Sequence, residues 1–231
     1  MKKCILPLAM ALFFSLPSIV KAQSELKHES IMAATNMILD SSYHLHGTVK
    51  FQIEGSPADS LRKWIAKEGK FAARVWVSQR FPDYEISKIE IPHKEALAGK
   101  LDIHCYLTAS NPLLFNAEHE LVIPAFMGYH PYILSIEDSL PDAIYSELML
   151  FQLNTEVAVK RAVVPSQMRK DGEQGCFLSF SPLVGGGMFR VLSKIGFVVS
   201  PESHCREDIG RDFSRLEKER FRLEMEPESD Q

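Results

Sequence analysis

The stretch from Thr48 to Gly69 constrains the fold more than any other part of the chain. Residues 48–54 alternate strictly between polar and apolar side chains, which is the period of a strand buried on one face. Ser56 follows with a hydroxyl that can cap a helix, and Pro57 suits the first helical position. Apolar residues at 61, 64 and 65 predict an amphipathic helix, and Gly69 can end it in the left-handed conformation. We therefore expect a strand, a helix and, over residues 71–78, a second strand.

A second junction of the same kind begins at Ile136. Residues 136–142 repeat residues 53–59, with Ile, Glu, Ser and Asp at the same offsets 83 positions later. The sequence around this junction predicts a short strand over 132–136, a helix that opens at Ser139, and a strand over 156–164. Apolar residues Ile144, Leu148 and Phe151 make the stripe of this helix. A tandem duplication is one hypothesis for this match, and a chance match is the other, because cap chemistry selects Ser and Asp at such places anyway.

Further strands and two flanking helices complete the predicted fold. The alternation of side chains predicts strands over 85–91, 101–108, 177–180, 188–192 and 195–200, with the glycines at 185–187 as a turn. Residues 25–39 and those from Arg206 onward have helical spacing, and residues 221–226 alternate like a short strand. The predicted class is α+β, with two similar strand-helix-strand modules, additional antiparallel strands and helices at both ends. The expected core contains Val49, Phe51, Ile53, Leu61, Trp64, Ile65, Ile103 and Leu107.

The amino terminus has the pattern of a secretory signal peptide. Lys2 and Lys3 precede an apolar run from residue 4 to residue 20, and Val20-Lys21-Ala22 offers a cleavage site. An uncleaved membrane anchor is the alternative, but prolines and polar residues interrupt the run. We expect a mature chain from Gln23 that is periplasmic or secreted, without a transmembrane span. Its predicted parts are the signal peptide 1–22, an α+β module 23–110, a second one 111–205, and a charged tail 206–231.

Charge and motifs exclude several classes of function. The formal net charge is −4, so the chain has no basic footprint for nucleic acid. We find no nucleophile elbow, no zinc-protease helix and no phosphate-binding loop, and the sequence predicts no cofactor. His44 and His46 are the best metal candidates, because residues two apart on a strand share a face. A zinc site needs a third ligand, however, and none stands at a telling spacing.

Three cysteines follow the predicted cleavage site. Cys105 falls on the apolar side of its strand, which is typical of a buried thiol. Cys176 and Cys205 lie near the ends of predicted neighbouring strands, and an oxidising compartment allows them to form a disulfide. We predict that Cys176 pairs with Cys205 and that Cys105 stays free.

The segment from Ser110 to Pro131 combines turn residues with many apolar ones. Its apolar residues, among them Leu113, Leu114 and Phe115, are expected to pack against the core. At its end, aromatic residues cluster around Gly128, and they are candidates for a partner-binding loop, with packing at the edge of the core as the alternative. These candidates are Phe126, Tyr129, His130 and Tyr132.

Two stretches resemble TonB carboxy-terminal domains. In residues 165–196, Pro165, Arg169, Gly172 and Gly175 precede an alternating strand, and the run around Arg190 is similar to that family's next hairpin. Residues 56–91 are loosely similar too, with a short helix that is followed by the two stretches 73–77 and 86–91. Ser179 and Ser181 depart from the family's apolar pattern. The resemblance implies a small α+β module that offers a strand edge to a periplasmic partner.

Together these features predict an exported, non-catalytic protein that binds or assembles another envelope or secreted protein. The alternative is a hydrolase or metal-dependent enzyme with dispersed residues that include His44 and His46. The fold alone does not separate the two classes.

Overall fold

The computed structural model describes residues 28–92, 99–135, 144–165, 168–169, 175–185, 188–199 and 206–225. The predicted signal peptide, the junction at 136–142 and Cys205 lie outside these residues. The helices are α1 (Ser56–Glu68), α2 (Lys70–Arg80), the 3₁₀ helix η2 (Tyr132–Ser135) and α3 (Arg206–Leu216). The strands are β1 (His28–Leu39), β2 (Leu45–Glu54), β3 (Tyr84–Glu90), β4 (Lys100–Ala109), β5 (Glu120–Pro124), β6 (Ile144–Thr155), β7 (Val159–Val163), β8 (Met168–Arg169), β9 (Gly175–Gly185), β10 (Met188–Val199) and β11 (Arg220–Met225).

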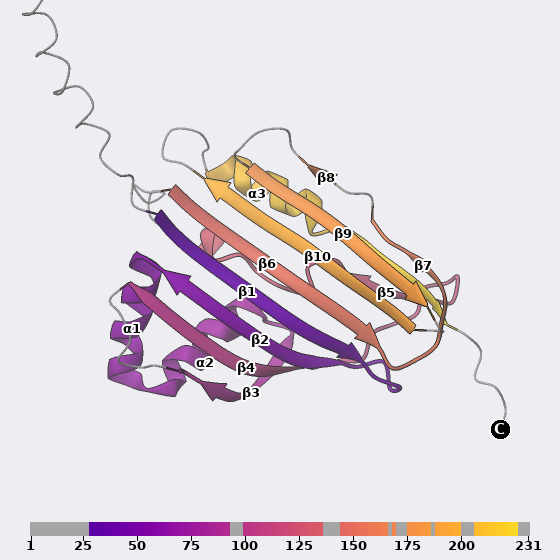
Figure 1. Cartoon of the computed structure of the whole chain (residues 1–231), viewed down its shortest axis with the longest axis horizontal. Helices are drawn as coiled ribbons and strands as arrows, with labels where there is room; N and C mark the ends of the chain where they lie inside the picture. Colours follow the sequence, from indigo (N-terminus) through magenta and orange to yellow (C-terminus); the bar gives the residue numbers. More distant parts are fainter. Residues whose placement is uncertain are drawn as a thin grey trace, which may run out of the picture.

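Most strands belong to one long sheet. Its order is β3-β4-β2-β1-β6-β10-β9-β8, and a three-stranded sheet has the order β5-β11-β7. β1 and β6 pair in parallel at the centre of the long sheet, and its other neighbours are antiparallel. The two halves of the chain therefore meet in one sheet through its parallel pair (Figure 1).

In the part of the long sheet whose side chains are described, from β3 to β6, one face is buried and the other is at least partly exposed. On β2, Val49, Phe51 and Ile53 are buried while the residues between them are at least partly exposed, as the alternation predicts. The Trp76 ring of α2 packs edge-on against Phe51 at 5.0 Å, and Phe221 of β11 lies 6.2 Å from Phe151 of β6. The helices and the second sheet thus cover this buried face, and Figure 1 shows the opposite, open face, with the long strands passing in front of α2 and β5.

The first junction forms as predicted, but its cap does not. β2 and α1 follow each other, and Gly69, with φ of 66°, separates α1 from α2. Ser56 is the first residue of α1 and Gly55 occupies the cap position, so the Ser56 hydroxyl does not cap the helix and donates instead to the buried Glu29 carboxylate of β1. Gly55 precedes it at φ of 80°, and a Cβ there would lie 2.8 Å from Glu29 Cγ. Glycine is therefore required where the chain passes over Glu29.

The strand expected over residues 71–78 is wrong, because this segment is the helix α2. Its buried residues are Ala72, Ala73, Trp76, Val77 and Arg80, which recur at helical spacing. Trp76 is buried, whereas the expected core residues Trp64 and Ile65 are only partly buried. The other six members of the expected core are buried.

The predicted amino-terminal helix over 25–39 is also wrong, since residues 28–39 form β1. The expected helix through Ile144, Leu148 and Phe151 is the strand β6. Both are central strands with apolar residues on both faces, so their sequences lack the clean period of two. Phe151 is buried, and Leu148 lies on the open face. Of the strand expected over 132–136, the described residues 132–135 form the 3₁₀ helix η2 instead.

The carboxy-terminal prediction is confirmed. α3 is followed by the short strand β11. The strands predicted over 156–164 and 177–180 correspond to β7 and β9, and those predicted over 188–192 and 195–200 are joined in the single strand β10. The described residues confirm the α+β class, but they do not show two similar strand-helix-strand modules: the first half has the order β2-α1-α2-β3, and in the second half a helix between two strands occurs as β10-α3-β11. No helix within the described ranges is both long and apolar enough to cross a bilayer.

Candidate functional site

A buried carboxylate organises the segment that precedes β6. Glu147 points into the core and accepts hydrogen bonds from the Tyr129 hydroxyl, from the Tyr145 hydroxyl at 2.6 Å, and from the backbone N–H groups of Tyr132 at 2.7 Å and Ile133 at 3.1 Å. We call these five residues the Glu147 cluster. Burial, and then the charge of Glu147, raises the pKa of Tyr129 and of Tyr145 well above the ordinary tyrosine value. Both phenols therefore stay protonated and donate to the carboxylate.

A buried cation lies beside this cluster. The Arg80 guanidinium stands 5.5 Å from the Trp76 ring centre and 5.2 Å from that of Tyr132, an arrangement that stabilises a cation through the ring faces. Its Nη2 donates to Ser135 Oγ at 2.9 Å. Arg80 and Glu147 thus hold η2 from two sides. These groups are engaged within the fold, which indicates a structural role.

The predicted aromatic loop belongs to this buried region. Phe126 and Tyr129 are buried, and His130 and Tyr132 are partly buried. Phe126 packs edge-on against Phe213 of α3 at 5.3 Å. Burial, followed by the charge of Arg80, lowers the pKa of His130. For Phe126 and Tyr129 the alternative of packing in the core holds, because both rings are buried, Phe126 against Phe213 and Tyr129 at 5.3 Å from Phe81.

The two candidate metal ligands differ in their surroundings. His44 precedes β2, and its backbone N–H donates to Asp40 Oδ1 at 2.9 Å. His46 lies on the open face of β2, with Nδ1 2.5 Å from the Tyr106 hydroxyl. Within the described ranges, no three His, Cys, Asp or Glu side chains are grouped so that they could hold a metal ion.

Cys105 is a free and buried thiol on β4. Burial raises its pKa to about 12, and the nearby Arg74 charge opposes this shift. Cys176 lies on β9 opposite Phe197. Because Cys205 is outside the described residues, the Cys176–Cys205 disulfide stays a prediction.

A different part of the 110–131 segment carries exposed apolar residues. Leu114 is 77% exposed and Phe115 is 41% exposed, contrary to the expectation that they pack against the core. We call this pair the apolar tip. The Leu113 N–H donates to the Tyr43 carbonyl at 2.9 Å, and the Phe115 and Tyr43 rings meet edge-on at 5.0 Å. The backbone on the amino-terminal side of the tip is thus fixed to the turn before β2.

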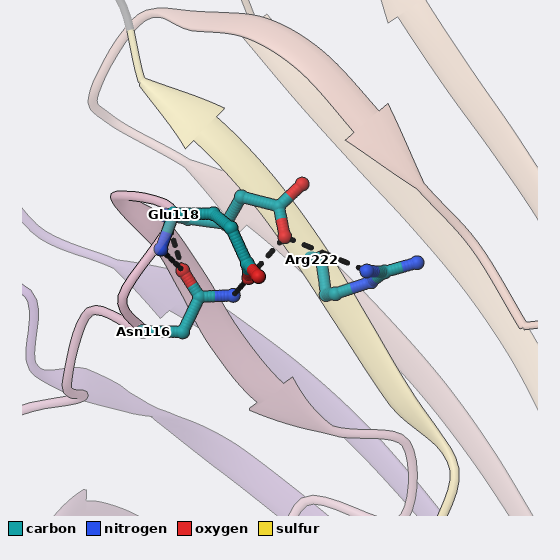
Figure 2. A network of polar contacts seen from close by, with 4 residues as sticks. Asn116, Glu118 and Arg222 are labelled. Carbon is teal, nitrogen blue, oxygen red and sulfur yellow. Dashed lines mark hydrogen bonds and ion pairs between the residues drawn. The ribbon is translucent and has the colours of Figure 1, made fainter.

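The other side of the tip is fixed by a turn around Asn116. Asn116 Oδ1 accepts the backbone N–H groups of Glu118 at 3.0 Å and Glu120 at 2.8 Å. Its Nδ2 donates to the carboxylates of the same two residues, and Arg222 of β11 lies 3.6 Å from Glu120 (Figure 2). We call this arrangement the Asn116 turn. It uses both polar atoms of the Asn116 amide to set the conformation of the loop.

Sequence reasoning missed both the Glu147 cluster and the apolar tip. Glu147 has a signal in the sequence, since it falls in the apolar phase of residues 145–153, but that phase is visible only if the segment is a strand. The apolar tip has no such signal, because the sequence does not show whether a leucine is buried or exposed.

Comparison of the chain with models of protein families, with curated proteins and with solved structures gave no match. The resemblance to TonB carboxy-terminal domains therefore stays a prediction.

Proposed function

We propose that the protein is an exported, non-catalytic binding or assembly protein that acts through contacts with another envelope or secreted protein. The observation that carries this proposal is the apolar tip, in which Leu114 and Phe115 are exposed on a loop held by hydrogen bonds on both sides. Apolar anchors that are already ordered lose little entropy on binding, so they contribute efficiently to affinity.

The surroundings of the tip indicate the chemistry of the partner. Glu118 is exposed next to the tip, and the ordered Asn116 turn fixes its backbone. An acidic group beside an apolar anchor favours a pocket that is apolar inside and basic at its rim. The same charge disfavours the surface of an anionic membrane. We therefore propose a protein partner with such a pocket.

The outer strand β3 is poorly suited to act as the strand edge that the resemblance implies. The outer strand β3 has an irregular register between Ser87 and Glu90, and Lys88 in it has φ of 51°. The Arg74 guanidinium donates to the Ile86 carbonyl on the same strand. Bulges, lysines and occupied carbonyls are features that oppose pairing with a further strand.

The test compares recovery of partners by two matched variants. The tagged protein is cross-linked in its native envelope, purified and read by mass spectrometry, as wild type, as Leu114→Asp and as Phe71→Asp. Phe71 on α2 is 63% exposed, so it is an exposed apolar residue away from the loop. We expect Leu114→Asp to lower recovery of a specific partner by about tenfold or more, the scale of an interface hot spot. Phe71→Asp should leave recovery unchanged, and equal recovery by both variants would reject the tip as the binding site.

Export is tested separately by amino-terminal sequencing. The mature protein should begin at Gln23, whereas an intact Met1 in the membrane fraction would support the anchor.

A further inference from the structure

The open face of the long sheet carries an apolar strip at its centre. The strip consists of Met32 and Ala34 on β1 and of Ile144, Leu148 and Leu150 on β6, all at least partly exposed. Met32 stands opposite Leu148, and Ala34 stands opposite Leu150. An antiparallel sheet that faces water is normally polar on that face, so the apolar strip needs a separate explanation.

From this geometry we infer that the open face packs against the same face of a second copy of the chain. The strip runs along the β1–β6 pair, with three strands on each side of it in the long sheet. A two-fold axis that lies between the two sheets, perpendicular to the strands, and crosses the middle of the strip would place the strip on the strip of the second copy. It would also place the flank formed by β2 and β4 on the same flank of the second copy, as a symmetric dimer requires. Two sheets can then pack face to face at about 10 Å.

The size of the face suits a stable dimer. The five strands β4, β2, β1, β6 and β10 are consecutive in the sheet. At a spacing of about 4.8 Å they span about 24 Å, and ten residues of strand extend about 33 Å, which gives a footprint of about 800 Å². Stable interfaces bury about 800 Å² on each partner. The open face is therefore large enough to hold a second copy.

The charges beside the strip also permit self-association. Lys50 and Glu54 of β2 and Lys100 and Asp102 of β4 lie on the open face, two of each sign. Lys100 Nζ already pairs with Glu54 at 2.9 Å. A flank of a single sign would repel its own copy, whereas this mixed flank does not.

The oligomeric state of the full chain tests this inference. We expect sedimentation equilibrium at micromolar concentration to show a dimer for the wild type and for Ser87→Lys. Ser87 is exposed on β3 and stands opposite Tyr106, so it adds the same charge outside the proposed footprint. Leu150→Lys should raise the dimer dissociation constant by about 100-fold, since each of the two copies carries the change and contributes about tenfold. An unchanged melting temperature would show that Leu150→Lys still folds.

Two further variants locate the interface. Met32→Cys lies between the two ends of the strip, which are marked by Ile144 and by Leu150, and it should give an oxidised cross-linked dimer beyond the background of the natural cysteines, whereas Ser87→Cys should not. A wild-type monomer at these concentrations overturns the inference, as does a Leu150→Lys variant that remains a dimer. Protection of the strip by a different protein or by lipid vesicles instead of a second copy also overturns it. Leu114→Asp should leave the dimer intact, which separates this result from the proposed function.

Discussion

Replacing the Glu147 carboxylate by an amide should destabilise the protein strongly. Each carboxylate oxygen accepts one tyrosine hydroxyl and one backbone N–H, the Tyr129 and Tyr132 donors on Oε1 and the Tyr145 and Ile133 donors on Oε2. In Glu147→Gln, the new NH₂ group must face one of these pairs. A phenol can rotate to accept from it, but a backbone N–H cannot.

The expected cost follows from these contacts. A hydrogen bond to a charged group contributes about 1.5–3 kcal/mol, and a buried donor left unpaired costs about 1–3 kcal/mol. We therefore expect Glu147→Gln to lower the free energy of unfolding by about 3–5 kcal/mol, as measured by urea denaturation. Glu118→Gln is the matched control, because it changes an exposed carboxylate, and it should cost less than about 1 kcal/mol. A cost for Glu147→Gln below about 1 kcal/mol would refute the role assigned to the cluster.

Three further predictions concern the core and the thiols. Trp76→Ala should destabilise by about 3–5 kcal/mol, because the ring is buried, and Trp64→Ala should cost clearly less; equal losses in urea denaturation would contradict the packing. Since burial raises the Cys105 pKa to about 12, the contribution of the protonated thiol to stability should be complete below pH 9 and be lost as the pH rises toward 12. Melting curves of Cys105→Ala should lack this loss of stability at alkaline pH. The same alkaline loss in the wild type and in Cys105→Ala would contradict the prediction. Non-reducing peptide mapping should find Cys176 bridged to Cys205, and alkylation of all three thiols without reduction would reject the pairing.

The parts of the fold that the sequence predicts are the strands and helices with one buried face and one solvent-exposed face. Val49, Phe51 and Ile53 alternate with polar residues, so β2 and the start of α1 could be derived. β1 and β6 could not, because they occupy the centre of the sheet and have apolar residues on both faces. In β6 the spacing of Ile144, Leu148 and Phe151 imitates a helix, although Phe151 points to the other face from Leu148.

The candidate sites depend on contacts that sequence spacing does not show. Glu147 is held by donors from the segment 129–133, which only the folded chain brings to β6. The exposure of Leu114 depends on the Asn116 turn and on the contact of Phe115 with Tyr43. The sequence shows an apolar run there, but the tertiary structure decides that its tip faces water.

Site-specific photo-cross-linking tests the central claim most directly. A photoreactive residue is placed at position 114 or, as the control, at position 71, and the cells are irradiated before the envelope and the secreted fraction are analysed. We predict a discrete cross-linked species from position 114, containing a second protein whose contact surface is apolar with a basic rim, and none from position 71. The same faint background at both positions would contradict the account.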